Sequence, residues 1–389
     1  QKLRITGRAN FTISTLKRLP DYLDATQYAE LANEAAVATS MNPIYSDTEM
    51  DIIRYGLDKD LYPNIDWQNE LLKKTSFQQT YYVSAQGGGS IARYFASLGM
   101  SKETSAYKMA GDSPYKDGVG YDTYNYRMNL DINITKTTKA YIGATSYLAI
   151  NKRPSMGQSY NGTSMTDWIW KSQAKTTPVM YPLRYSNGYL PASNDGEDIS
   201  PYVLLNYTGS TKQQDFRNLV TLALEQDFSF VTKGLTAKIQ GSLDVQSLLG
   251  ESRYKMPALY MATGRNSQGQ LILSQRVTPV TVGYSSAAST WRKLYFDANV
   301  NYNRKFGDHS IGALLYYYIQ DTHSTGAASS MDAIPKRYQS LSGRINYGFQ
   351  DTYFIDANFG YTGSENFQPG RQYGFFPSVA LAWVPTQYK

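Results

Sequence analysis

The stretch KLRITGRANFTIS, residues 2–14, decides the fold, because apolar and polar side chains alternate along it at every step. Ile5 and Phe11 stand at odd positions, whereas Arg4 and Arg8 stand at even positions. Successive side chains of a β-strand point to opposite faces of the sheet. The stretch is therefore predicted to form a strand with one apolar face and one polar, charged face.

The same two-residue period recurs along the whole chain. Most of the repeating segments exceed the ~5–6 residues usual in globular sheets and reach the ~9–11 residues that a tilted membrane-spanning strand needs. Strands are predicted near residues 2–14, 75–86, 91–101, 121–134, 139–150, 215–228, 234–247, 290–304, 310–322, 337–349, 352–364 and 373–384.

Short and long links alternate between these segments. Tight turns are predicted at Gly87–Ser90, Thr135–Thr138, Ser229–Lys233, Lys305–His309 and Gln350–Asp351. Longer links occupy residues 15–74, 102–120, 151–214, 248–289, 323–336 and 365–372. Outer-membrane barrels have short periplasmic turns and long extracellular loops. The predicted fold class is therefore all-β, an antiparallel transmembrane β-barrel with water inside and lipid outside.

The first long link is expected to contain helices. Asp24 with Gln27, and Ser46 with Glu49, resemble capping boxes at helix starts, and a third helix is expected from about Asp66 through Leu72. The long extracellular loops are therefore predicted to be partly helical.

Composition narrows the class of protein. The 389 residues are 41% hydrophobic, the mean hydropathy is -0.47, and no apolar run approaches the ~18 residues that a spanning helix requires. A helical membrane protein is excluded, whereas a membrane barrel needs only every second strand residue to be apolar. The 35 Tyr residues favour the barrel, because amphipathic rings gather at membrane interfaces.

Charge and cysteine content exclude several functions. The chain has no Cys, so it has no disulfide, thiolate metal site or cysteine nucleophile. Its net charge of +6 is spread along the chain, and no basic run with interleaved aromatic residues indicates a nucleic-acid surface. Because Gln1 is not an initiator and Lys389 follows a strand-like run, we expect a piece of a longer protein.

Several runs together resemble one family in the right order along nearly the whole chain. They are LPDYLDATQYAELANEA (19–35), YPNIDW (62–67), GGS leading into RYFASLG (88–99), YRMNLD (126–131), NYNRKFGDH (301–309), YGFFPS (373–378) and Trp383. This series resembles the SusC/RagA-type TonB-dependent outer-membrane transporters of the Bacteroidetes. The stretch 362–367 follows the family's aspartate-glycine-serine run only loosely.

The resemblance implies a plugged barrel of about 22 strands, of which residues 1–389 are the N-terminal part with about 12 strands. The plug and the remaining strands are expected outside this chain. The resemblance also implies a location in the outer membrane of a Gram-negative bacterium, a SusD-like lipoprotein lid, energy from TonB, and import of oligosaccharides or oligopeptides.

Aromatic residues of the link 151–214 are the candidate substrate-binding residues. Their rings could stack on sugar faces, or they could pack the core of the loop or contact the lid. The candidates are Trp168, Trp170, Tyr185 and Tyr189, and the same link also contains Tyr160 and Tyr181. These aromatic residues favour an oligosaccharide over an oligopeptide.

Polar residues on the strands are the candidates for the barrel lumen. They could line the route of a solute, contact the plug, or only solvate a polar lumen. The candidates are Arg93, Arg127, Asp131, Asp297 and Arg344.

No cofactor, metal or catalytic set is predicted. Asp195, Glu197 and Asp198 could hold Ca²⁺, but their spacing lacks the ligands of a full calcium loop, which favours a solvated turn. His309 and His323 lack partners at a catalytic or zinc-binding spacing. Nutrient import is therefore preferred over an outer-membrane enzyme and over a structural or adhesive barrel without transport.

Overall fold

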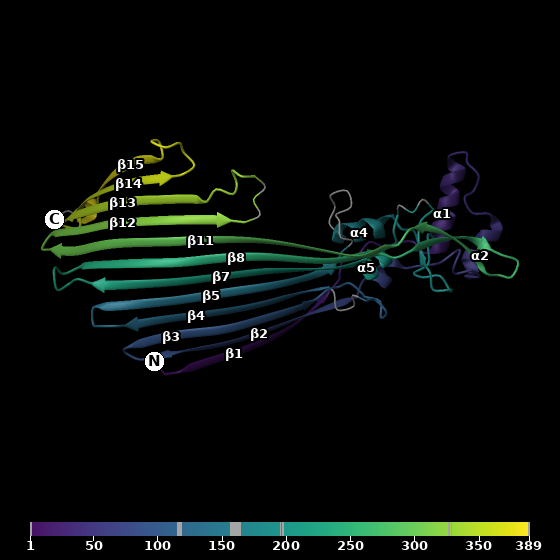
Figure 1. The fold of residues 1–389 in the computed structure, drawn as a ribbon, viewed down its shortest axis with the longest axis horizontal. Coiled ribbons are helices and arrows are strands. Elements are labelled where there is room, and N and C mark those ends of the chain that lie inside the picture. The colour runs from purple at the N-terminus through teal and green to yellow at the C-terminus, as the bar shows by residue number, and fades with distance from the viewer. Residues whose placement is uncertain are drawn as a thin grey trace.

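Twelve strands form one antiparallel sheet in the computed structural model, which describes residues 2–114, 119–155, 165–194, 196, 198–325, 327 and 329–387. Neighbours in sequence are neighbours in the sheet, so the chain is a continuous up-and-down meander (Figure 1). The strands are β1 (Arg4–Thr15), β2 (Thr75–Gly88), β3 (Ala92–Thr104), β4 (Gly120–Asn133), β5 (Thr138–Pro154), β7 (Gly209–Asp227), β8 (Leu235–Met256), β11 (Val280–Phe306), β12 (His309–Ser324), β13 (Lys336–Phe349), β14 (Tyr353–Ser364) and β15 (Tyr373–Trp383). All twelve predicted strands are confirmed.

The short turns lie together at one end of the sheet and the long links at the other (Figure 1). Gln350 and Asp351 show how tight these turns are, with φ values of 53° and 51°. Two successive residues at positive φ are typical of a type I′ turn, whose twist matches that of the strands it joins. The sorting of turns and loops that the sequence predicts is therefore confirmed.

Strands β7, β8 and β11 are longer than the sequence pattern indicates, with 19, 22 and 27 residues. At ~3.3 Å per residue, a strand of that greatest length spans about 90 Å, far beyond the ~25 Å apolar band of an outer-membrane barrel. Much of the predicted long link over residues 248–289 is therefore strand, and the predicted bounds of these strands are corrected. Here β8 and β11 continue outward, and β9 (Leu259–Arg265) and β10 (Leu271–Val277) form a hairpin at the tip.

Large apolar side chains are exposed on one face of the sheet. Ile5 is 66% exposed, Ile239 47% and Phe296 41%. A soluble sheet would bury this face against a second layer, but both hydrophobic clusters found among the described residues lie mainly in the long links. An apolar face of this extent marks a surface that meets a membrane.

The long links contain helices α1 (Ala25–Ala38), α2 (Asp47–Tyr55), α3 (Trp67–Leu71), α4 (Met165–Lys175) and α5 (Pro201–Asn206). Capping boxes at Asp24 and Ser46 begin α1 and α2, and Asp66 caps α3, so the three predicted helix starts are confirmed. The last of these helices ends at Leu71 rather than Leu72. No helix in the described ranges has the length and apolar character needed to cross a bilayer.

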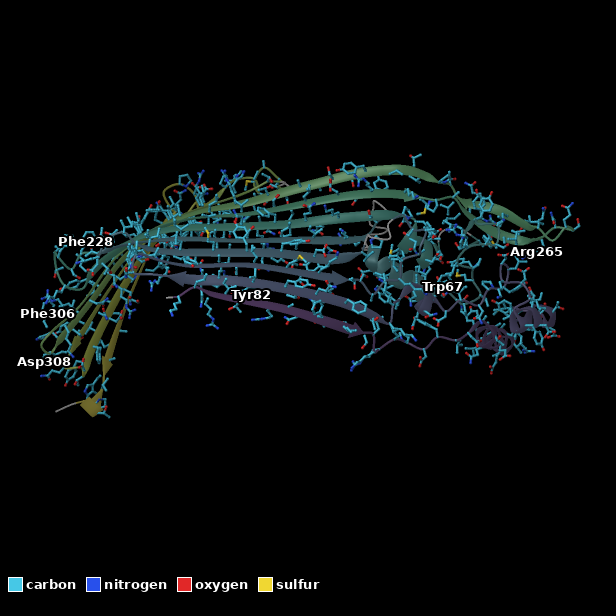
Figure 2. All side chains as sticks on the ribbon, turned by 90° about the horizontal axis from the view of Figure 1, so that it is seen from below. Trp67, Tyr82, Phe228, Arg265, Phe306 and Asp308 are labelled. Atoms are coloured by element: carbon cyan, nitrogen blue, oxygen red, sulfur yellow. The ribbon has the colours of Figure 1, made fainter. Side chains whose placement is uncertain are left out.

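Helices α4 and α5 have no counterpart in the predicted elements. Five of the six residues of α5 are buried, so its sequence shows no apolar stripe of helical period. The other elements are β6 (Leu190–Pro191), which pairs with β9, and a short 3-10 helix, η1 (Pro385–Gln387). Figure 2 shows that the sheet is curved and that the loop helices gather at the end away from the short turns.

Candidate functional site

The strand register places all five predicted lumen residues on one face of the sheet. Arg93 lies opposite Asp131, and the row of directly opposed residues continues from Asp131 across the sheet. That row is Tyr141, Ala223, Gln240, Asp297, Tyr318, Ser340 and Thr362. Arg127 and Arg344 share this face, because each stands four residues from a member of the row on its own strand.

Charged residues on this polar face form ion pairs along the sheet. Arg344 donates to Asp356 on β14. Arg217 lies 3.0 Å from Asp215 on β7, and Gln246 donates to the same carboxylate at 3.0 Å. Asp356, Arg217 and Asp215 are not among the predicted lumen residues, although all three lie on the same face of the sheet as those residues. Neutralised pairs of this kind suit a polar surface inside a barrel.

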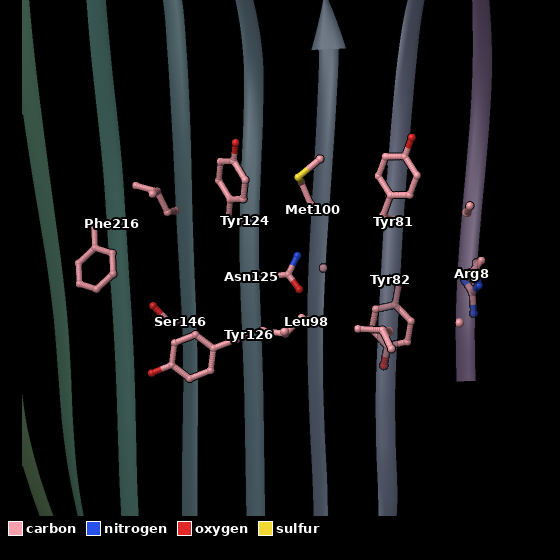
Figure 3. Close-up of a pocket in the computed structure, with 15 residues that line it drawn as sticks. Arg8, Tyr81, Tyr82, Leu98, Met100, Tyr124, Asn125, Tyr126, Ser146 and Phe216 are labelled. Carbon is pink, nitrogen blue, oxygen red and sulfur yellow. The ribbon is translucent and has the colours of Figure 1, made fainter. Parts of the chain in front are cut away.

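The opposite face carries an apolar hollow of about 890 Å³. A second row of opposed residues crosses it, formed by Ala9, Tyr81, Met100, Tyr124, Leu148 and Phe216. Figure 3 shows Tyr81, Met100 and Tyr124 side by side on neighbouring strands. Because this face is the apolar one, we expect acyl chains rather than a solute to fill the hollow.

Residues from distant links share one hydrophobic core outside the sheet. Trp67, Ile169, Leu204 and Leu259 belong to this core, and three of them are fully buried. Trp67 also donates its indole N–H to the carbonyl oxygen of Thr177 at 3.1 Å. Links that lie far apart in sequence therefore form one folded body, called here the loop unit, comprising residues 16–74, 105–114, 165–208 and 257–279 of the described chain.

An arginine joins three links of the loop unit. Arg265 on β9 donates to Asp58 at 2.6 and 2.8 Å and to Asp60 at 3.0 Å. Asp60 also accepts hydrogen bonds from the backbone N–H and the hydroxyl of Ser186, at 2.8 and 2.7 Å. The guanidinium hydrogen bonds hold the pKa of Asp58 below its ordinary value, so its carboxylate stays charged.

A second polar group lies at the inner side of the loop unit. Tyr207 donates to Asp112 at 2.8 Å, and Arg184 donates to both of them, at 2.6 and 2.7 Å. The hydrogen bond from Tyr207 lowers the pKa of Asp112, whereas burial raises the pKa of Tyr207. The phenol therefore keeps its proton and remains a donor.

Only two of the four candidate aromatic residues are exposed. Trp170 is 42% exposed and packs against Tyr107, with ring centroids 6.1 Å apart. Tyr189 is 46% exposed and packs against Tyr260 at 4.5 Å. The two rings therefore pack against different residues. Of the four candidates, these two are the ones that a solute could contact.

The other two candidates pack within the loop unit. Tyr185 is 5% exposed, and its hydroxyl accepts a hydrogen bond from the backbone of Ala262 at 3.0 Å. Trp168 packs against the hydrophobic core, and Tyr181 is 2% exposed inside it. Tyr160 lies outside the described residues.

The predicted acidic turn is described only in part. Asp198 lies 3.5 Å from the ammonium group of Lys175, and Asp195 and Glu197 lie outside the described residues. Within the described ranges, no group of three or more His, Asp or Glu side chains is placed to hold a metal ion. His309 is hydrogen-bonded to Tyr347 at 2.6 Å, in a turn far from the loop unit.

A continuous antiparallel meander, apolar on one face, polar on the other and covered by folded loops at one end, defines this chain as part of an outer-membrane β-barrel. Comparison with known proteins identifies the kind of barrel. The TonB-dependent receptor P3 of Formosa agariphila is 23% identical over 350 residues, which cover 82% of this chain and 31% of that protein. No family model matches the chain.

Two solved structures have the same fold. The RagAB peptide importer in its "closed-closed" state matches with a TM-score of 0.66 and 18% identity, over 97% of this chain and 44% of that one. A second structure of the RagAB peptide transporter matches with a TM-score of 0.65 and 17% identity, over the same shares. The chain thus spans less than half the length of these relatives. Its resemblance to SusC/RagA-type TonB-dependent outer-membrane transporters of Gram-negative bacteria is confirmed.

Proposed function

We propose that the protein containing this chain imports an oligomeric nutrient across the outer membrane, using energy supplied through TonB. One observation carries the proposal: a polar sheet face leads to a folded loop unit, while the opposite face is apolar and exposed. This arrangement provides a wet route through the barrel and a structure at its outer end that can capture a solute.

The parts of the chain have separate tasks in this proposal. The loop unit would capture the oligomer at the cell surface, and the polar face that carries Arg127, Asp131 and Asp297 would hold it inside the barrel. A plug encoded outside this chain would close the lumen until TonB pulls on it. A SusD-like surface lipoprotein would cover the loop unit as a lid. The proposed activity is transport, and it requires no catalytic group on this chain.

Two substrate classes compete within this proposal. The exposed rings of Trp170 and Tyr189 favour an oligosaccharide, because flat aromatic faces can stack on sugars. The fold shared with RagAB, which is described as a peptide importer, favours an oligopeptide. The chemistry of a cavity in the loop unit, described below, favours the peptide.

Uptake by intact cells tests the proposed import. Cells that lack the full-length protein should lose accumulation of fluorescent oligomers of one class, and cells that lack TonB should show the same loss. Restoring the protein should restore uptake, and the lipoprotein should co-purify with it. Unchanged uptake of both oligopeptides and oligosaccharides in the deletion strain would contradict the proposal.

A further inference from the structure

A cavity of about 420 Å³ lies in the loop unit, away from the strands of the barrel. Its walls come from three segments that are distant in sequence: residues 20–24 with Tyr28, residues 64–68, and residues 173–178 around the end of α4. This volume falls within the ~300–1,000 Å³ of small-molecule sites. The cavity has room for a few residues of an oligomer.

Hydrogen bonds fix the three walls to one another. Gln68 donates to the carbonyl oxygen of Pro20 at 2.7 Å, and the backbone N–H of Ala25 donates to Asn64 at 3.1 Å. On the other side, the N–H of Ile65 donates to the carbonyl of Pro178 at 3.1 Å. Trp67, which lines the cavity, makes the indole bond to Thr177 described above. The cavity is therefore preformed rather than a gap between independent loops.

One polar side chain in the wall lacks a partner. Gln173 is 5% exposed and lines the cavity, and no hydrogen bond joins its amide to another described residue. Because this amide is unpaired at the wall of a cavity, it is available to a ligand. A ligand that offers both a donor and an acceptor, as a peptide group does, would satisfy both ends of this amide.

The charged residues in the wall are mainly acidic. Asp21, Asp24 and Asp66 line the cavity. Asp24 and Asp66 each use Oδ1 to cap a helix, which leaves Oδ2 for another donor. Lys175 is the cation of the lining, and its ammonium group lies 3.5 Å from Asp198. The surplus of carboxylates favours a positively charged ligand.

We infer that this cavity binds a cationic segment of an oligopeptide, with an ammonium group beside the carboxylates of Asp21, Asp24 and Asp66 and a peptide group paired with the amide of Gln173. The inference rests on the proposed import function and places part of the solute recognition in the loop unit rather than in the barrel lumen. The rings of Tyr22 and Tyr28 would flank the aliphatic part of the segment.

Binding to the full-length protein in detergent tests the inference, with the indole of Trp67 in the cavity wall as one fluorescent reporter beside calorimetry. The probes are a lysine–glycine tripeptide, the same tripeptide acetylated at both amino groups, and a neutral maltotriose. We expect the free tripeptide to bind, the acetylated form to bind at least about tenfold more weakly, and maltotriose not to bind.

Substitutions locate the site. Gln173→Leu, which keeps the volume, should weaken binding about 5- to 20-fold. Asp66→Asn and Asp24→Asn should each weaken binding several-fold, because Asn caps a helix as Asp does but lacks the charge. Asp21→Asn removes a charge at an exposed position where the side chain pairs with no described residue. The protein that carries this substitution should therefore fold normally. Glu34→Gln, an exposed acidic position on α1 outside the cavity, is the matched control.

The outcomes distinguish a failure of the cavity assignment from a failure of the proposed import. Tripeptide binding that is unchanged in both Gln173→Leu and Asp21→Asn would overturn the inference, as would binding of maltotriose in place of the peptide. If these variants bind normally and TonB-dependent uptake continues, only the cavity assignment fails. If neither class of oligomer is taken up by cells that carry the unmodified protein, the proposed import itself fails.

Discussion

Arg265 donates two hydrogen bonds to Asp58, at 2.6 and 2.8 Å, although 207 residues separate them in sequence. The pair joins the tip of the β9–β10 hairpin to the segment that follows α2, and Asp60 extends the contact to Ser186. Because bidentate arginine–carboxylate pairs are both directional and comparatively strong, this contact fixes the outer part of the loop unit.

Replacing Arg265 by Gln should loosen the outer part of the loop unit. We expect a loss of about 1–2 kcal/mol in local stability, because the pair is partly exposed and solvent screens it. Hydrogen exchange of residues 57–62 and 259–265 should accelerate by about tenfold. Arg276→Gln, on the same hairpin but bonded to the neutral Asn194 at 3.3 Å, should change exchange little. Equal protection in both variants would show that the arginine pair does not hold the loops.

The same contact predicts how the loops respond to acid. Arg265 lowers the folded-state pKa of Asp58, so the stabilisation is fully present above the unfolded-state pKa of about 3.9. It is lost only as the pH falls through the lower folded-state value. The loop unit should therefore resist proteolysis at neutral pH and open below about pH 4, and Arg265→Gln should remove this pH dependence. Opening that begins near neutral pH would contradict the assignment.

Adjacent residues of β4 test which face meets lipid. Met128 is 43% exposed on the apolar face, whereas Arg127 lies on the polar face. Met128→Arg should cost about 2–4 kcal/mol and reduce the yield of folded barrel, as measured by the heat-dependent shift on gels. Arg127→Gln should change stability by less than about 0.5 kcal/mol. The opposite ranking would reverse the assignment of the two faces.

The start of α2 depends on Glu49. Its carboxylate accepts hydrogen bonds from the backbone of Ser46 at 2.8 Å and from the hydroxyl of Tyr62 at 2.6 Å, and the Tyr62 bond lowers the pKa of Glu49. Glu49→Ala should therefore destabilise α2 by about 1–2 kcal/mol and expose its first turn to hydrogen exchange. Glu34→Ala on α1 serves as the control, and equal exchange in the two variants would contradict the capping role.

The exposed rings of the loop unit could contact either the solute or the lipoprotein at the cell surface. Trp170→Ala should weaken capture of the oligomer about 3- to 10-fold while leaving lipoprotein co-purification unchanged, because an exposed aromatic ring adds about 0.5–1.5 kcal/mol. Trp168→Phe, inside the loop unit, is the control for packing. Loss of the lipoprotein with full retention of solute binding would instead assign Trp170 to the lid contact.

The regular parts of this fold can be predicted from sequence because they repeat locally. Alternation at every second residue located the strands, and side chains such as Asp24 and Ser46 located helix starts within a few residues. The outer halves of β8 and β11 could not be located in this way. Both faces of these outer halves meet water, so polar residues such as Glu251 and Arg253 do not distinguish one face of the sheet from the other.

The candidate site was harder to predict because its environment is set by distant segments. Tyr185 is buried by a strand that follows it by 77 residues, and no local pattern reveals that contact. Gln173 likewise carries no motif. Its significance comes from segments around Tyr22 and Trp67 that meet it only in the folded loop unit. The polar sheet face, by contrast, follows directly from strand parity, so residues such as Asp131 and Asp297 can be assigned to one face from the sequence.

The fully buried Leu259 has a consequence for biogenesis. This side chain belongs to a core that also contains Trp67. The loop unit therefore cannot reach its final packing until the segment around residue 259 has crossed the bilayer. The strands that come earlier in the sequence must therefore pair before the core of the loop unit is complete. Contacts of such long sequence separation are slow to form, so we expect the outer end of a newly inserted barrel to mature after its wall.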